Sequence, residues 1–199
     1  MNKKQKTLLI IGIIILFVII IFSSFKRNYN SMVIMDETVS GNWSQVENVY
    51  QRRADLIPNL VNTVKGYAKH EKETLEGVIE ARAKATSTTI DASKLNANSI
   101  QQFQAAQDGL SSALSKLMVV VERYPDLKAN ENFRDLQAQL EGTENRISVE
   151  RRNFNESVKS YNAFIRQFPK NIYANMFGFE KREYFKAMEG SEKAPEVKF

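Results

Sequence analysis

The sequence contains no cysteine, and its 199 residues include only one histidine, four prolines and eight glycines. Without cysteine the chain has no disulfide framework, no thiolate catalysis and no lipid anchor attached through a thiol. The scarcity of glycine and proline favours long helices over a turn-rich β fold. The length predicts one domain with additional segments.

Catalytic and cofactor-binding motifs are also missing. His70 and Glu71 resemble the start of a zinc-protease motif, but Thr74 stands where that motif requires a second histidine. The sequence has no G-x-S-x-G nucleophile motif and no G-x-x-x-x-G-K-[ST] phosphate loop. We therefore interpret His70 as a helix-surface residue. We assign no catalytic, cofactor-binding or metal-binding residue and expect a protein that is not an enzyme.

Positive charge is confined to the start of the chain. Residues 1–27 hold five basic residues and no acid, which accounts for the whole net charge of +5, so residues 28–199 are neutral. A neutral domain lacks the basic surface of a nucleic-acid-binding protein, and we expect no nucleic-acid partner. The same neutrality argues against strong attraction to anionic lipid.

Residues 7–25 form a long uncharged run, TLLIIGIIILFVIIIFSSF. A helix of this length spans about 28 Å, close to the ~30 Å hydrocarbon core of a bilayer. A cleavable signal peptide has a similar start, but the residues from Phe22 to Phe25 offer no pair of small residues at the spacing that cleavage requires. We predict that residues 1–27 are an uncleaved signal-anchor of a single-pass protein of the cell membrane. The residues assigned to this anchor include Leu8, Leu9, Ile10, Ile15, Phe17, Phe22 and Phe25.

The charges that flank this run indicate an orientation. Three lysines precede it, whereas Lys26 and Arg27 follow it. Because basic residues are retained on the cytoplasmic side, the excess favours a cytoplasmic N-terminus and an exported domain.

Three later stretches carry apolar residues at helical spacing. The first runs from Trp43 to about Ala85, after an interruption predicted at residues 40–42. Pro58 either kinks this helix or breaks it, and the uninterrupted apolar ladder favours a kink. Polar residues 86–99 predict a loop.

The second helix is expected from Ile100, capped by residue 98 or 99, to Tyr124, and residues 125–129 form a connection. Asn130 caps a third helix that runs from Glu131 to about Phe168. Apolar residues seven apart predict coiled-coil-like packing at shallow angles. The fold class is therefore all-α: an N-terminal transmembrane helix followed by an antiparallel up-and-down bundle of three or four long helices.

The C-terminal part is rich in aromatic residues, and residues 184–189 are predicted to add a helical turn or more. The aromatic residues are Tyr173, Phe177, Phe179, Tyr184 and Phe185. Packing against the end of the bundle is the favoured interpretation. A protein-docking patch and insertion at a membrane interface remain open.

Three charged residues occupy or flank inward-facing positions of the predicted helices: Arg53 on the first, and Glu144 and Glu150 on the third. Charges at such positions fix helix register at some cost in stability, or extend to solvent on their aliphatic stems. We predict a structural polar layer in which Arg53 pairs with one of the two acids.

Several blocks of the sequence resemble the bacterial LemA family. They are WSQVENVYQRRADLIPNLVNTVKGYAKHEKETLEGVIEARA, VVERYPDLKANENFRDLQAQLEGTENRISVERRNFNESVKSYNAFIRQFP and FGFEKREYF. The resemblance covers roughly residues 28–188 and implies a helical bundle domain there, tethered to the membrane by one N-terminal helix. The polar residues 189–199 that follow are predicted to be a flexible tail. It implies no particular activity, because the family has no established enzymatic function. A magnetosome-associated relative suggests, by analogy only, a part in membrane organisation.

Together these features predict a non-enzymatic, membrane-anchored scaffold or interaction module with an unidentified protein partner. A homo-oligomer is left open. The alternative is a protein that organises or remodels the membrane through contact with lipid, and an enzyme is less favoured.

Overall fold

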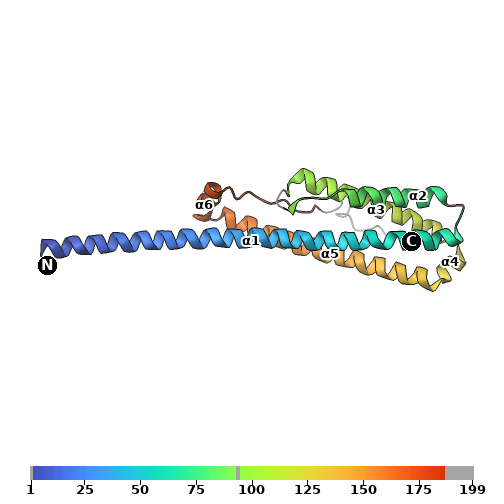
Figure 1. The fold of residues 1–199 in the computed structure, drawn as a ribbon, viewed down its shortest axis with the longest axis horizontal. Helices are drawn as coiled ribbons and strands as arrows, with labels where there is room; N and C mark the ends of the chain where they lie inside the picture. The colour runs from blue at the N-terminus through green and yellow to red at the C-terminus, as the bar shows by residue number, and fades with distance from the viewer. Residues whose placement is uncertain (1, 93–94, 187–199) are drawn as a thin grey trace, which may run out of the picture. The chain divides into compact units, whose positions relative to one another are not determined.

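A computed structural model describes residues 2–92 and 95–186, and these residues form six α-helices and no strand (Figure 1). The helices are α1 (Lys3–Tyr67), α2 (Lys72–Ser87), α3 (Ala97–Val121), α4 (Pro125–Ala129), α5 (Glu131–Arg166) and α6 (Lys170–Phe177). The predicted all-α fold is confirmed. The described residues form two compact units: a first unit of residues 2–39 and 157–182, and a second unit of residues 40–92, 95–156 and 183–186.

Helix α1 does not stop where the sequence predicts. It continues through residues 40–42, because Val39 and Trp43 on either side are fully buried and their packing outweighs the weak helix propensity of Ser, Gly and Asn. It also continues through Pro58, so a break at this proline is excluded. The proline ring removes the N–H that would bond the carbonyl of Ala54. Arg82 of α2 replaces that donor, with its Nε 2.8 Å from the Ala54 oxygen.

The first helix ends at Tyr67, and the prediction that it reaches Ala85 is wrong. A turn lies between α1 and α2, and Glu71 at its end accepts hydrogen bonds from Arg123 Nη2 and Tyr124 Oη, both at 2.9 Å. These contacts come from residues far along the chain. Ala68 and Leu75, at the start of the turn and just after it, are both buried and keep the seven-residue spacing, which is why the periodicity alone does not reveal the turn.

Helix α3 begins earlier than predicted, at Ala97, and its cap is Asn96 rather than residue 98 or 99. Asn96 and Ser99 form a capping box, in which each side chain accepts a hydrogen bond from the other's backbone N–H. Residues 125–129, predicted to be a connection, form the short helix α4. Asn130 caps α5 as predicted, since its Oδ1 accepts from Phe133 N at 3.0 Å.

The C-terminal part differs most from the prediction. Helix α6 was not predicted, and it ends at Gly178, whose φ of 75° is left-handed and suits glycine. Residues 184–186 are not helical, so the helical turn predicted there is wrong. Residues 187–189 of that turn, and the tail predicted at 189–199, lie outside the described residues.

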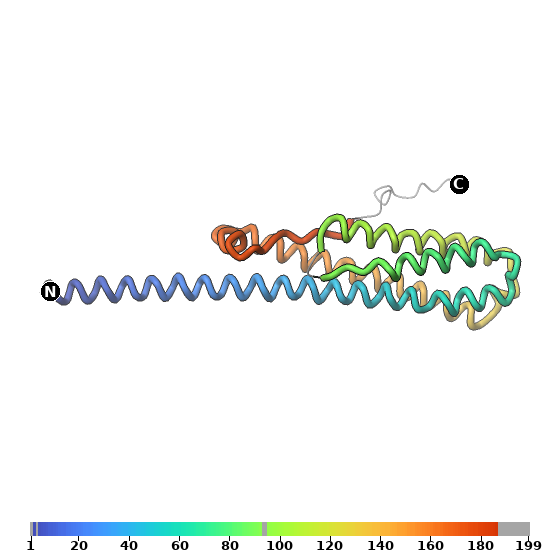
Figure 2. The backbone as a smooth tube through the Cα atoms, turned by 45° about the horizontal axis from the view of Figure 1, so that its top comes forward, coloured from blue at the N-terminus to red at the C-terminus, as the bar shows by residue number. Residues whose placement is uncertain are grey.

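The second unit is a bundle of four helical segments: the C-terminal part of α1, α2, α3 and the N-terminal part of α5. Figures 1 and 2 show these segments side by side. Their shared core consists of Ile57, Leu60, Val61, Val64, Ala68, Leu75, Val78, Ala85, Leu110, Leu117, Val121, Leu127 and Phe133. Leu127 lies on the short helix α4 and was not part of the predicted ladder, whereas the other core residues follow the apolar spacing read from the sequence.

The first unit is held by both apolar and polar contacts. Met32, Val158 and Tyr161 are fully buried in it. Arg182 forms a bidentate pair with Asp36, with Nε–Oδ1 and Nη2–Oδ2 distances of 2.9 and 3.0 Å. This pair joins the segment after α6 to α1.

Candidate functional site

The N-terminal part of α1 carries a continuous apolar surface. Its large apolar side chains from Leu8 to Phe22 are 48–69% exposed, and the helix is long and apolar enough to cross a membrane. Six of the seven residues assigned to the anchor from the sequence lie in this exposed part. Phe25, the seventh, is only partly exposed, because its ring packs edge-on against two rings of the C-terminal part. Its ring centre is 5.6 Å from that of Tyr173 and 5.0 Å from that of Phe177.

Arg53 lies at the centre of the second unit and is only 3% exposed. Its Nη1 is 3.0 Å from Glu144 Oε2 on α5 and 3.0 Å from Ser111 Oγ on α3. Its Nη2 donates to Gln107 Oε1 at 2.8 Å and to the Gln107 carbonyl at 3.2 Å. We call Arg53, Gln107, Ser111 and Glu144 the Arg53 layer. One guanidinium thus joins three helices.

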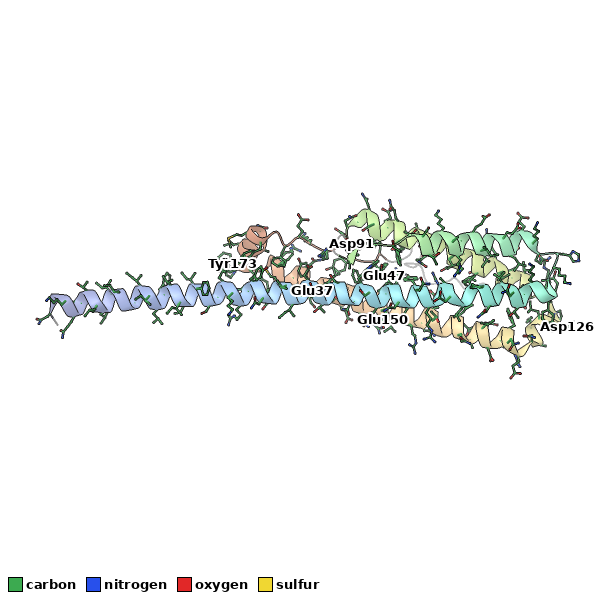
Figure 3. All side chains as sticks on the ribbon, viewed as in Figure 1. Glu37, Glu47, Asp91, Asp126, Glu150 and Tyr173 are labelled. Atoms are coloured by element: carbon green, nitrogen blue, oxygen red, sulfur yellow. The ribbon has the colours of Figure 1, made fainter. Side chains whose placement is uncertain are left out.

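The Arg53 layer also reaches α2, because Gln107 Nε2 donates to the carbonyl of Ala85 at 3.3 Å. Of the two acids predicted as partners of Arg53, the structure places Glu144 in contact. Glu150 lies on α5 (Figure 3) and accepts a hydrogen bond from Asn153 instead. The side chain of Glu144 is 52% exposed, so the layer joins a buried cation to a solvent-accessible acid.

The residues after α6 form an extended segment, 179–186, that we call the C-terminal strap. Two asparagines of α5, one heptad apart, bind its backbone. Asn155 donates to the Phe185 carbonyl and accepts from its N–H, at 3.2 and 2.9 Å. Asn162 makes the same pair of bonds with Arg182, at 2.8 and 3.0 Å. Each asparagine side chain therefore satisfies both the C=O and the N–H group of one strap residue, as the backbone of a neighbouring strand does in a sheet.

The aromatic residues of the C-terminal part separate into two groups. Phe185 stacks on Trp43 with ring centres 5.6 Å apart and an interplanar angle of 18°. Arg151 also lies over this ring, with its guanidinium carbon 4.7 Å from the Phe185 ring centre. Tyr173, which is labelled in Figure 3, and Phe177 instead contact Phe25 of α1. Phe185 therefore packs into the bundle, which is the interpretation that the sequence favours. The two aromatic residues of α6 pack against the N-terminal part of α1 instead.

The tyrosine beside the strap has an altered ionisation. Tyr161 Oη donates to the Glu180 carbonyl at 2.9 Å. Burial, assisted by the negative charge of Asp36, raises the pKa of Tyr161 to about 12. The neutral phenol is therefore the form that the fold requires.

The bundle surface has shallow open grooves. One, of about 780 Å³, lies along α3 beside Tyr184 and Lys186 and is lined by a mixture of apolar and polar side chains. Another lies beside Glu47, where burial raises the pKa of the carboxyl group. Within residues 2–92 and 95–186, no cluster of three or more His, Asp or Glu side chains could hold a metal ion. His70 is exposed in the turn after α1 rather than on a helix surface.

Several structurally important polar residues were not predicted from the sequence. Gln107 and Ser111 complete the Arg53 layer, and Asn155 and Asn162 hold the strap. The available signal was a polar side chain at an inward position of a helix, which indicates a buried hydrogen bond but not its partner.

Comparisons with known proteins place this architecture in a family. The chain matches the sequence model of the LemA family over residues 42–199. The magnetosome protein MamQ of Magnetospirillum gryphiswaldense is 28% identical over 198 residues, covering 89% of this chain and 71% of the relative. The magnetosome protein MamQ 2 of Paramagnetospirillum magneticum is 26% identical over 192 residues, covering 86% and 69%. Protein LemA of Metamycoplasma hominis is 25% identical over 146 residues, covering 73% of this chain and 63% of the relative. None of these names states an enzymatic activity. Because the family match extends over most of its length, the chain belongs to the LemA family.

Proposed function

We propose that this LemA-family protein is a non-enzymatic scaffold or interaction module held at the cell membrane by residues 1–27, with residues 28–188 as the helical domain. The observation that carries the proposal is the exposed apolar surface between Leu8 and Phe22, on the same helix that continues into the bundle. In water this surface is unfavourable, whereas a bilayer covers it and leaves no backbone group unsatisfied. The relatives named magnetosome proteins support a membrane setting.

The scaffold role follows from what the bundle offers to other molecules. Its interior is filled by apolar side chains and by the Arg53 layer, in which Gln107 and Ser111 already accept hydrogen bonds from Arg53. The sequence carries none of the catalytic motifs that we considered. The open grooves and long helix faces suit contact with another protein better than enclosure of a small substrate.

Membrane extraction tests the anchor. We expect the full chain to stay with membranes after high-salt and alkaline washes, and a chain that starts at Asn28 to be released. As a control, Ile34→Lys changes an exposed apolar residue beyond the run and should leave retention unchanged. Recovery of a mature chain that lacks residues 1–24 would show that the apolar run is a cleaved signal and would overturn the anchor.

Crosslinking in cells tests the interaction module. We expect the same crosslinked proteins when residues 7–25 are replaced by an unrelated apolar run of equal length, because the bundle selects the partner. If the partners change with the run, the bundle is not the interaction module.

Labelling of introduced cysteines tests the proposed orientation, and the natural chain has no cysteine that would interfere. A membrane-impermeant maleimide applied to intact spheroplasts should label Gln137→Cys and spare Lys4→Cys. The reverse pattern would place the bundle in the cytoplasm.

A further inference from the structure

We infer that α6 is a second membrane contact, which lies in the headgroup region of an anionic phospholipid surface and inserts Phe168, Ile172 and Met176. This inference rests on the proposed membrane anchor, and it assigns a lipid-binding role to a helix far along the chain from that anchor.

Helix α6 has two different sides. Ala174 is buried, and the rings of Tyr173 and Phe177 face α1. On the other side, Ile172 and Met176 are four residues apart and therefore share a helix face. They are 54% and 56% exposed, and Phe168, four residues earlier in the preceding turn, is 82% exposed. No part of the described chain covers these three side chains.

The ring contacts fix the height of α6 relative to the apolar run. Phe25 is the last residue of the run, and it contacts both Tyr173 and Phe177. The ring centres of Tyr29 and Phe177 are 4.7 Å apart. Four residues of helix advance about 6 Å, so α6 lies beside the last turn of the run and the first turn after it. When residues 7–25 cross the hydrocarbon core, this position is the membrane interface, where aromatic side chains concentrate.

Charge favours an anionic surface. Residues 157–182 contain five basic residues and one acid, Glu180, and one of the five, Arg182, is paired with Asp36. Lys26 and Arg27, which follow the run directly, are exposed. Basic side chains next to a bilayer are attracted to anionic headgroups. Residues 28–199 are neutral as a whole, but they include this basic segment next to the proposed membrane span, and the segment attracts anionic lipid although the domain carries no net charge.

The geometry also explains why an exposed apolar face is tolerated on so short a helix. A soluble protein seldom leaves a contiguous apolar patch uncovered. At the interface, apolar side chains on one face of a helix enter the boundary between headgroups and acyl chains, and the polar face stays in water. Asn175, which is exposed on the groove side of α6, provides that polar face.

Fluorescence depth measurements on the full chain test this inference. Single cysteines are introduced at Ile172, Met176 and Asn175, labelled with an environment-sensitive dye, and reconstituted in vesicles of phosphatidylethanolamine and phosphatidylglycerol. We expect dyes at 172 and 176 to have blue-shifted emission, strong quenching by doxyl-labelled lipid and weak quenching by iodide. A dye at 175, on the same helix, should show the opposite pattern.

Two reference positions separate this inference from the proposed anchor. A dye at Ile14→Cys should be quenched by lipid and one at Gln137→Cys by iodide. If Ile14 is in lipid but positions 172 and 176 behave like 137, α6 does not touch the membrane and the inference fails while the anchor stands. If Ile14 is also in water, the anchor itself fails. Equal insertion of 172 and 176 in pure phosphatidylcholine vesicles would overturn the assignment to an anionic surface.

Discussion

The Arg53 layer predicts an energetic coupling between Arg53 and Glu144. The two side chains are 3.0 Å apart, but they differ in environment, since Arg53 is 3% exposed and Glu144 is 52% exposed. Exposed ion pairs contribute about 0–1 kcal/mol, whereas loss of one partner of a fully buried pair costs roughly 3–5 kcal/mol. A pair with one partner of each kind should fall between these limits. We therefore expect a coupling of about 1–3 kcal/mol.

Each single substitution removes a different part of the layer. Arg53→Met keeps an apolar stem of similar length but removes the donor to Gln107, whose buried Oε1 is left without that hydrogen bond. Glu144→Gln keeps the shape but leaves the buried guanidinium with neutral acceptors only. Each change should lower the free energy of unfolding by about 1–3 kcal/mol, the range for an unsatisfied buried polar group or a lost charged hydrogen bond.

Urea unfolding of the wild type, both single variants and the double variant gives the coupling free energy. The measurement uses chains that start at residue 28, followed by circular dichroism. Glu150→Gln, alone and with Arg53→Met, is the matched control, because Glu150 contacts Asn153 instead. Its coupling should stay below about 0.5 kcal/mol. If Arg53 couples no more strongly to Glu144 than to Glu150, the pair does not stabilise the bundle and our reasoning about the layer is wrong.

Three further predictions follow from single side chains. Ile147→Ala should lower the free energy of unfolding by about 2–5 kcal/mol because Ile147 is buried, whereas the exposed Gln137→Ala should change it by less than about 0.5 kcal/mol; equal midpoints in urea would contradict the assigned core. The raised pKa of Tyr161 means that its stabilising contribution is complete below its unfolded value of 10.0 and is lost as the pH rises towards about 12. Unfolding followed across this range should therefore show a smaller alkaline loss in Tyr161→Phe than in the wild type, and identical pH profiles would refute the assignment. Phe185→Ala should cost about 3–5 kcal/mol and shift the emission of Trp43, the one tryptophan, to longer wavelength, and unchanged emission would show that the strap does not cover this ring.

The helices themselves could be predicted because their apolar residues recur every seven positions, and the buried residues of the core repeat that pattern. The ends of the helices could not. The turn after Tyr67 depends on Glu71 meeting Arg123 and Tyr124, and no local signal encodes a contact between residues so far apart. Helix α6 and the strap were missed because both are too short to show a period.

The candidate site was partly visible in the sequence. Arg53 and Glu144 stand out as charges at inward positions, and the apolar run up to Phe25 stands out by length alone. Their neighbours do not. Ser111 is an ordinary residue in a helix, and only the packing of α3 against α1 turns its hydroxyl into an acceptor for Arg53. The aromatic residues of α6 were noticed as a cluster, but the sequence could not say which of them meet Phe25.

The way the strap is held has a consequence for the order of events on the ribosome. Chains emerge N-terminus first, and Asp36 is 146 residues ahead of its partner Arg182. The helical hairpins can form while synthesis continues, but the Trp43 ring stays without its stacked neighbour until Phe185 has been made. A chain that stops before the strap would therefore be rich in helix yet expose aromatic surface that chaperones and proteases recognise. Completion of the bundle in this way distinguishes a finished polypeptide from a truncated one.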